Sequence, residues 1–85
     1  MKIKKNLSII IPVYNGEDSI EQCISNVSEE AKKYTHEIIV IDDCSTDKTF
    51  SIVSKFKNIK LIKLDKNMGV GYARNKGIEH SKYDI

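Results

Sequence analysis

The amino-acid sequence predicts an α/β fold in which a parallel sheet carries helices on both faces. Two observations predict it: β-branched runs recur along the chain, and stretches with the apolar period of a helix lie between them. Three strand–helix units in sequence form a parallel sheet with right-handed crossovers. The 85 residues suffice for one small domain or part of a larger one, and a composition that is 40% hydrophobic and 31% charged is typical of a globular chain.

The first unit begins with the β-branched run 7–11, which is followed by Pro12 and a turn. Such a run suits a strand buried on both faces of the sheet. The next apolar residues are spaced as on one face of a helix: Ile20, Cys23, Ile24, Val27 and Ala31. We expect Asn15 or Asp18 to cap this helix, and Cys23 to be a small buried residue on its inner face.

The second unit begins with the run 37–41, which stops at the polar loop 42–47. In that loop, Ser45 or Thr46 is expected to cap the next helix, because both side chains can accept a hydrogen bond from the first helical turn. The inner face of this helix is expected at Thr49, Ile52, Val53 and Phe56.

The third unit begins with residues 59–64, where apolar residues and lysines alternate as in a strand nearer the sheet edge. A polar loop and a third helical face follow, the latter comprising Val70, Ala73, Gly77 and Ile78. Residues 83–85 are typical of the start of a fourth strand. We therefore expect the N-terminal half of a larger domain, with residues 1–6 as a basic leader, residues 7–85 as the domain portion, and marginal stability for the chain alone.

Charge and hydropathy argue against several classes of protein. A net charge of +2 provides no strong basic field for nucleic acid. No apolar run approaches the roughly 18 residues of a membrane span, and the N-terminus has no secretory signal pattern. Cys23 and Cys44 stand apart, without metal-ligand spacing, so we expect reduced thiols in a cytoplasmic protein.

Polar residues gather where the predicted strands end. Pro12 and Tyr14 follow the first strand, Asp42 and Asp43 the second, and Arg74 lies beyond the third. Because ligands bind at the carboxyl ends of parallel strands, we expect these residues to converge on one crevice. Together they suit a nucleotide: a ring stacks on the base, a carboxylate accepts from a base N–H or ribose hydroxyl, and a guanidinium neutralises a carboxylate or meets a phosphate. Taken alone, the acidic segment equally fits a loop with an Asx turn and a helix cap.

Three ordered segments carry a specific resemblance, namely residues 7–17, 37–47 and 67–77. They closely resemble the start of family 2 glycosyltransferases, the inverting GT-A enzymes that use nucleotide-diphosphate sugars. The resemblance covers nearly the whole chain. It implies a Rossmann-like sheet that forms the N-terminal, nucleotide-binding half of a GT-A domain. For the full-length parent, it implies transfer of a sugar from a nucleotide-diphosphate donor, usually a UDP-sugar, to a hydroxyl acceptor with inversion.

The same resemblance implies nucleotide-binding roles for Pro12, Tyr14, Glu17, Asp42, Asp43 and Arg74. The first three match the loop that wraps the base and the ribose. Asp43 matches the carboxylate that contacts the base, whereas Asp42 matches a neighbour more often used in loop geometry. Arg74 matches the basic residue that faces the nucleotide pocket. Cys44 departs from the family pattern, which has Gly there, and leaves the backbone angle at this position open.

The resemblance further implies a Mg²⁺ or Mn²⁺ cofactor in the parent, held by a DxD-type motif at the end of a fourth strand. Asp84 stands too early for that motif, so we expect no metal ligand and no catalytic residue in this chain, and no sugar transfer by it alone. The parent is expected to act in cell-envelope polysaccharide biosynthesis, in the cytoplasm or at the inner face of the membrane. An exposed sheet edge, where a fourth strand would pair, predicts a homodimer.

Two alternatives remain open at this point. Another βαβ nucleotide-binding enzyme, such as a dehydrogenase or a nucleotidyltransferase, would share the first strand, although the G-x-G-x-x-G fingerprint is absent after it. A non-enzymatic receiver-like module would also place paired aspartates at a strand end, and residues 64–66 read Leu-Asp-Lys at the end of the third strand.

Overall fold

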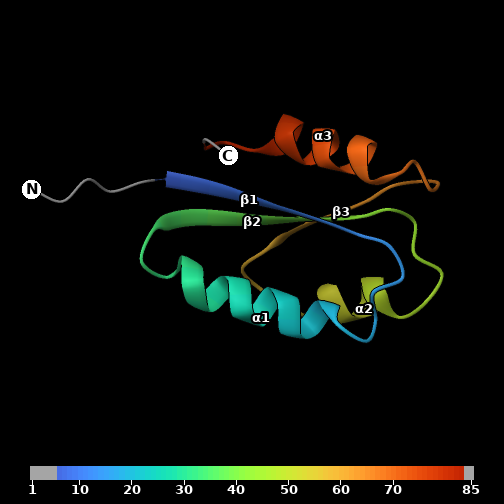
Figure 1. Cartoon of the computed structure of the whole chain (residues 1–85), viewed down its shortest axis with the longest axis horizontal. Coiled ribbons are helices and arrows are strands. Elements are labelled where there is room, and N and C mark those ends of the chain that lie inside the picture. Colours follow the sequence, from blue (N-terminus) through green and yellow to red (C-terminus); the bar gives the residue numbers. More distant parts are fainter. Residues whose placement is uncertain (1–5, 84–85) are drawn as a thin grey trace, which may run out of the picture.

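The computed structural model describes residues 6–83, and in it three parallel strands form one sheet in the order β1-β2-β3. Helices cover both faces of this sheet, as predicted: α1 and α2 lie on one face and α3 on the other (Figure 1). In chain order the elements are β1 (Asn6–Val13), α1 (Ile20–Ala31), β2 (Thr35–Asp42), α2 (Thr49–Val53), β3 (Lys60–Lys63) and α3 (Val70–His80). The leader at residues 1–5, Asp84 and Ile85 lie outside the described residues.

The central strand, β2, supplies the middle of the sheet and of the core. Its residues 38–41 are almost completely buried, because β1 and β3 pair with its two edges and helices cover its two faces. The run that begins β1 was expected to be equally buried. Instead only Ser8 is buried in β1, Asn6 is exposed and the other residues are half-buried, because within the described residues β1 pairs on one side only.

Two separate apolar clusters hold the helices to the sheet. On the first face, α1 and α2 pack on alternate residues of β2, and the buried members are Ile20, Ile24, Ile38, Val40 and Val53. On the second face, α3 packs on the other residues of β2, and the buried members are Ile39, Ile41, Leu64 and Ala73. Each fully buried isoleucine contributes about 1.5–3 kcal/mol relative to an exposed one. The period-two alternation of β2 thus distributes the core between both layers.

Gly77 explains how closely α3 approaches the sheet. A Cβ atom on this residue would lie 2.5 Å from Cγ2 of Ile10 and 3.4 Å from Cδ1 of Ile41. The second distance is an ordinary van der Waals contact, but at the first one either the Ile10 side chain or the helix would have to shift. The sequence placed Gly77 on the inner face of the third helix, and the structure shows that the absence of a side chain is what lets that face reach β1.

The helix caps predicted from the sequence are wrong. The residue that precedes α1 is Ser19 and the one that precedes α2 is Lys48, and neither side chain makes a capping hydrogen bond. In place of Ser45 or Thr46, the carboxylate of Asp47 accepts from the backbone N–H of Thr49, at 2.9 Å. α2 is also shorter than predicted, since Phe56 lies beyond its end.

Cys23 is likewise a correction, because its side chain is exposed rather than buried. It lies at the margin of the apolar stripe of α1, whose buried residues are Ile20, Ile24 and Ala31. Both Cys23 and Cys44 are free thiols. The helical period therefore located the stripe correctly but did not define its width.

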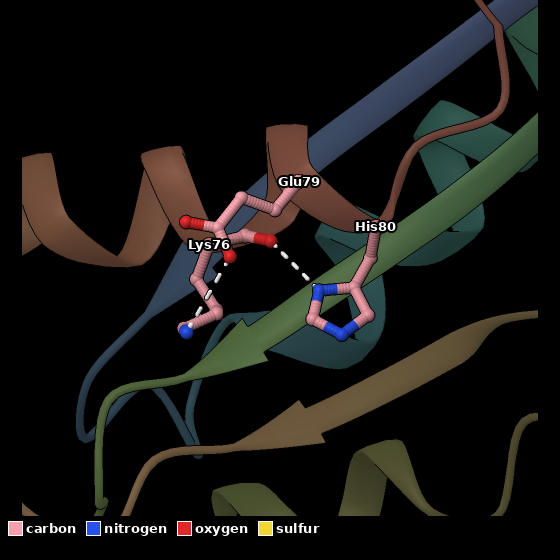
Figure 2. Close-up of polar contacts among 3 residues, drawn as sticks. All are labelled: Lys76, Glu79 and His80. Carbon is pink, nitrogen blue, oxygen red and sulfur yellow. Dashed lines mark hydrogen bonds and ion pairs between the residues drawn. The ribbon is translucent and has the colours of Figure 1, made fainter.

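The last turn of α3 is exposed and held by local contacts (Figure 2). The Lys76 ammonium lies 3.5 Å from a carboxylate oxygen of Glu79, and the Nδ1 of His80 lies 2.9 Å from the Lys76 carbonyl oxygen. Since a carbonyl only accepts, His80 donates this hydrogen bond through Nδ1. An exposed ion pair of this kind contributes little to stability.

After α3 the chain returns to the amino ends of β1 and β2. The backbone N–H of Lys82 donates to Oε2 of Glu37 at 2.7 Å, and that of Tyr83 donates to Oγ of Ser8 at 3.0 Å. The Ser8 hydroxyl donates in turn to Glu37 Oε2 at 2.6 Å. Tyr83 therefore lies beside the amino end of β1, and the predicted start of a further strand at residues 83–85 stays a prediction, since Asp84 and Ile85 lie outside the described residues.

Candidate functional site

A small pocket lies at the carboxyl ends of β1 and β2, beside the start of α3. Its volume is about 80 Å³, and its lining residues are Pro12, Val13, Tyr14, Asp43, Val70 and Ala73. The predicted convergence of the first two strand ends with the third helix is therefore present. The pocket is smaller than the roughly 300–1,000 Å³ of a typical small-molecule site. It can hold the edge of a planar ring, and the remainder of a larger ligand would lie outside it.

Tyr14 forms one side of this pocket and is 50% exposed, so that its ring remains available to a ligand. Pro12 lies beside it at the end of β1, where its fixed backbone angle limits the directions the chain can take. Both residues were predicted to belong to the site from their place after the first strand, and the structure places both at the pocket wall.

The loop that carries Tyr14 is fastened to the loop after β2. The backbone N–H of Asn15 donates to Oγ of Ser45, and the backbone N–H of Thr46 donates to Oδ1 of Asn15, each at 2.8 Å. The next backbone N–H, of Gly16, donates to Oγ1 of Thr49 at 2.8 Å. Asn15 has a positive φ of 51°, a conformation that asparagine tolerates better than most residues. These contacts, which join residues about 30 positions apart, were not foreseen from the sequence.

Glu17 belongs to the same inter-loop network rather than to the pocket wall. Its carboxylate accepts from the backbone N–H of Lys48 at 2.9 Å, and its own N–H donates to Oδ2 of Asp47 at 3.2 Å. Its predicted contribution to a ribose pocket stays a prediction. Partial desolvation raises the pKa of Asp47, but hydrogen bonds from Thr49 and from the Glu17 N–H outweigh it, and the pKa lies below its ordinary value.

Asp42 is fully buried and serves the local turn. Its Oδ1 accepts from the backbone N–H of Ser45, three residues later, at 3.1 Å, so the bond is local to the loop but spans one residue more than an Asx turn. Within residues 6–83, its Oδ2 has no hydrogen-bond partner. Asp42 does not line the pocket.

Asp43 has a different environment, because it lines the pocket while both of its carboxylate oxygens accept backbone hydrogen bonds. Oδ1 accepts from Met68 at 2.7 Å, and Oδ2 accepts from Gly69 at 2.9 Å. The side-chain amide of Asn67 donates to the Asp43 backbone carbonyl at 3.3 Å. We call these three hydrogen bonds the Asp43 clasp. The sequence identified Asp43 as a site residue, but it gave no sign that the loop before α3 would bind to it.

Cys44 adopts a backbone conformation that favours glycine. Its φ is 63°, in the left-handed region that favours glycine. Its thiol lies 3.6 Å from the backbone carbonyl oxygen of Asp65, which links the loop after β2 to the loop after β3. The backbone angle left open by the sequence is therefore that of a left-handed residue.

Arg74 is exposed on the first turns of α3, next to the pocket-lining Ala73. Among the described residues, no hydrogen bond or ion pair joins Arg74 to Asp43, whose oxygens accept from backbone amides instead. The predicted neutralisation of Asp43 by Arg74 is thus not present in this structure. Contact of its guanidinium with a phosphate stays a prediction.

No group of three or more His, Cys, Asp or Glu side chains between residues 6 and 83 could hold a metal ion. The residues described here therefore do not fit the Mg²⁺ or Mn²⁺ implied by the resemblance, and we derive no step through a metal. Among the same residues, no helix has the length and apolar character needed to cross a membrane.

Comparison with known families shows to which protein family this chain belongs. Residues 8–85 match the sequence profile of Glycosyl transferase family 2. The chain belongs to this family. Membership confirms the resemblance seen in the three ordered segments. It also decides against a dehydrogenase-like enzyme and against a receiver-like module.

Curated relatives of this family member include enzymes of cell-wall polymers. A poly(ribitol-phosphate) beta-glucosyltransferase of Bacillus spizizenii is 39% identical over 82 residues, which are 89% of this chain and 13% of the relative. The poly(ribitol-phosphate) beta-N-acetylglucosaminyltransferase TarS of Staphylococcus aureus is 35% identical over 80 residues, which are 88% of this chain and 14% of TarS. The chain spans a third or less of the length of the curated relatives it matches.

Solved structures agree with the fold. The Pyrobaculum calidifontis mannosyltransferase PcManGT, in complex with GDP-Man and Mn²⁺, superposes with a TM-score of 0.84 at 26% identity, over 94% of this chain and 25% of that protein. Residues 1–349 of S. aureus TarS in complex with UDP-GlcNAc superpose with a TM-score of 0.79 at 31% identity, over 95% of this chain and 24% of that structure. The family 2 chain thus has the α/β architecture predicted for the N-terminal part of a GT-A domain.

Proposed function

We propose that the protein to which this chain contributes is an inverting glycosyltransferase, and that residues 6–83 form the nucleoside half of its donor site. The observation that carries the proposal is the pocket that brings Tyr14 and Asp43 together at the strand ends of a family 2 chain. The overall reaction would transfer a sugar from a nucleotide-diphosphate donor to a hydroxyl acceptor. Because the chain spans only part of its relatives, acceptor binding and the chemical step are assigned to the parent as a whole.

Each pocket residue has a role that follows from its chemistry. Tyr14 stacks on the base, since its exposed ring offers a flat apolar face. Asp43 accepts a hydrogen bond from a base N–H or a ribose hydroxyl. Pro12 shapes the wall next to the base, and Asp42 maintains the turn that presents Asp43. Glu17 and Arg74 lie outside the lining, where we propose contacts with the ribose and with a phosphate, respectively.

The donor is proposed to be a UDP-sugar. The TarS structure with UDP-GlcNAc supports this choice, whereas the PcManGT structure with GDP-Man makes a guanosine donor the alternative. Both uracil and guanine present a ring N–H that can donate a hydrogen bond to a carboxylate. The relatives that act on poly(ribitol-phosphate) support an acceptor in cell-envelope polysaccharide synthesis, on the cytoplasmic side of the membrane.

A divalent metal, Mg²⁺ or Mn²⁺, is proposed for the parent, with ligands outside residues 6–83. The Mn²⁺ in the PcManGT complex supports this assignment. When bound, such an ion neutralises the charge that develops on the leaving diphosphate. A homodimer through the free edge of β1 is proposed as well; no comparison supports it, and light scattering that shows only monomer at high concentration would remove it.

Isothermal titration calorimetry tests the proposed site directly. UDP, GDP and NAD are titrated separately into the purified chain. We expect UDP to bind most tightly, GDP more weakly and NAD not measurably. Binding of NAD without binding of UDP would overturn the proposal, and tighter binding of GDP than UDP would replace the uridine donor with a guanosine donor.

A further inference from the structure

Residues 67–69, in the loop between β3 and α3, belong to the third ordered segment, but the sequence assigned no role to them. The loop carries no pocket-lining residue of its own until Val70, yet three of its consecutive residues bind to Asp43. Asp43 itself is 4% exposed, so its carboxylate has few alternatives to these partners. The Asp43 clasp therefore determines how this carboxylate is oriented before any ligand arrives.

The geometry of the Asp43 clasp leaves the carboxylate able to accept more. Each oxygen of a carboxylate has two lone-pair positions, and each oxygen of Asp43 accepts one backbone N–H. One position on each oxygen remains for a ligand. Because both oxygens already accept, the side chain is restrained in rotation and presents acceptors only.

Two features of the loop allow its residues to donate to Asp43. Gly69 has a φ of 95°, which other residues adopt at a cost, and its N–H is thereby directed at Oδ2 of Asp43. Asn67 contributes the only side chain among the clasp donors, since its amide donates to the backbone carbonyl of Asp43 while Met68 and Gly69 donate through the backbone. Asn67 is exposed and lies outside the pocket lining, so that it acts through Asp43 and not by touching the base.

We propose that Asn67 is a positioning residue for nucleoside recognition, which holds the 67–69 loop so that Asp43 presents its free lone pairs to the pocket. This inference rests on the proposed nucleoside site. A restrained acceptor discriminates between bases: uracil offers a ring N–H at N3, whereas cytosine offers a lone pair at the same position. Asn67 therefore contributes to the preference for UDP over CDP without contacting either.

The test compares UDP and CDP affinities for wild-type chain, Asn67→Ala and Asn67→Gln. Asn58→Ala is the matched control, because Asn58 is exposed, precedes β3 and makes no side-chain hydrogen bond within residues 6–83. Losing one hydrogen bond weakens UDP binding by about 2–10-fold in Asn67→Ala. The UDP-to-CDP preference should shrink with it, because a carboxylate free to rotate no longer disfavours cytosine. Asn67→Gln, which keeps the amide donor, should recover part of the UDP affinity and part of the UDP-to-CDP preference.

Amide NMR shifts of Met68 and Gly69 provide a second readout that does not depend on ligand. In Asn67→Ala both amide protons should move toward the positions of unbonded amides, and in Asn58→Ala they should not. If Asn67→Ala keeps the wild-type UDP-to-CDP preference and leaves both amides unmoved, the inference is wrong although the nucleoside site stands. If the wild-type chain itself does not prefer UDP to CDP, the proposed uridine site fails first, and the amide shifts still decide whether Asn67 holds the loop.

Discussion

Polar residues lie at both ends of the sheet, but they are used in opposite ways. At the amino ends of β1 and β2, Ser8 and Glu37 bind the segment after α3. At the carboxyl ends, Asp43 is equally well bonded but also lines a pocket, beside the half-exposed Tyr14. Hydrogen bonding alone therefore does not mark Asp43 as a binding residue, and the pocket that it lines with Tyr14 is the observation that does.

The largest expected effect is a loss of UDP binding when Asp43, at the carboxyl end of β2, is substituted. Asp43→Asn replaces one acceptor oxygen with an amide group, which opposes both the loop amides and a base N–H. We expect UDP binding to weaken by about 1–3 kcal/mol, the scale for losing a charged hydrogen-bond partner. Calorimetry measures this change against Asp65→Asn, an exposed aspartate in the next loop. Unchanged affinity in Asp43→Asn would remove Asp43 from the site.

A second substitution separates the inter-loop network from the pocket. Asn15→Ala removes the acceptor for Thr46 and places alanine at a φ of 51°, so the chain should lose about 1–2 kcal/mol of unfolding free energy. Asn15→Gly removes the same acceptor but tolerates the backbone angle, and should lose less. Urea unfolding measures both. Equal losses in the two variants would show that the backbone angle contributes nothing.

A third substitution removes the hydrogen bonds of Glu37 at the amino ends of the strands. Glu37→Ala removes the acceptor for both Ser8 and the backbone of Lys82, and should lower the unfolding free energy by about 0.5–1.5 kcal/mol. UDP affinity should not change, because the pocket lies at the other end of the strands. Glu30→Ala is the control, since the only polar contact of the Glu30 side chain within residues 6–83 is an exposed ion pair with Lys33. A loss of UDP affinity in Glu37→Ala would contradict the separation of the two ends.

The smallest effect concerns pH and involves both ends. Burial raises the pKa of Glu37, but hydrogen bonds from Lys82 and Ser8 and the charges of Lys82 and Lys60 lower it below its ordinary value of 4.5. The pKa of Asp47 likewise lies below its ordinary 3.8. A carboxyl with a lowered pKa in the folded chain stabilises the fold above its ordinary pKa, and this contribution is lost as the pH falls through the folded value.

The free energy of unfolding should therefore decline as the pH falls from about 5 toward 3. The decline should be less steep in Asp47→Asn than in the wild type, because the variant lacks this carboxyl group. Urea unfolding across this range measures the slope. Identical slopes in the two proteins would mean that Asp47 is not held in its charged form by Thr49 and Glu17.

The sequence predicted those features that depend on local pattern. β-branched runs located β1 and β2, the helical period located α1 and α3, and the strand-end rule brought Tyr14 and Asp43 to one pocket. The features that it missed depend on partners far along the chain. Asn15 did not cap α1, because its side chain reached Thr46, and Asp43 bound the loop at Met68 and Gly69, 25 and 26 residues away. A local pattern carries no information on such partners.

The proposed nucleoside site is tested most directly by an amide NMR titration of the chain with UDP. Amide shifts are expected at Tyr14, at Asp43 and at the start of α3, and none at Ser8, Glu37 or Lys82. Shifts confined to the amino ends of the strands, or a well-dispersed spectrum that does not respond to UDP, would contradict the proposed site.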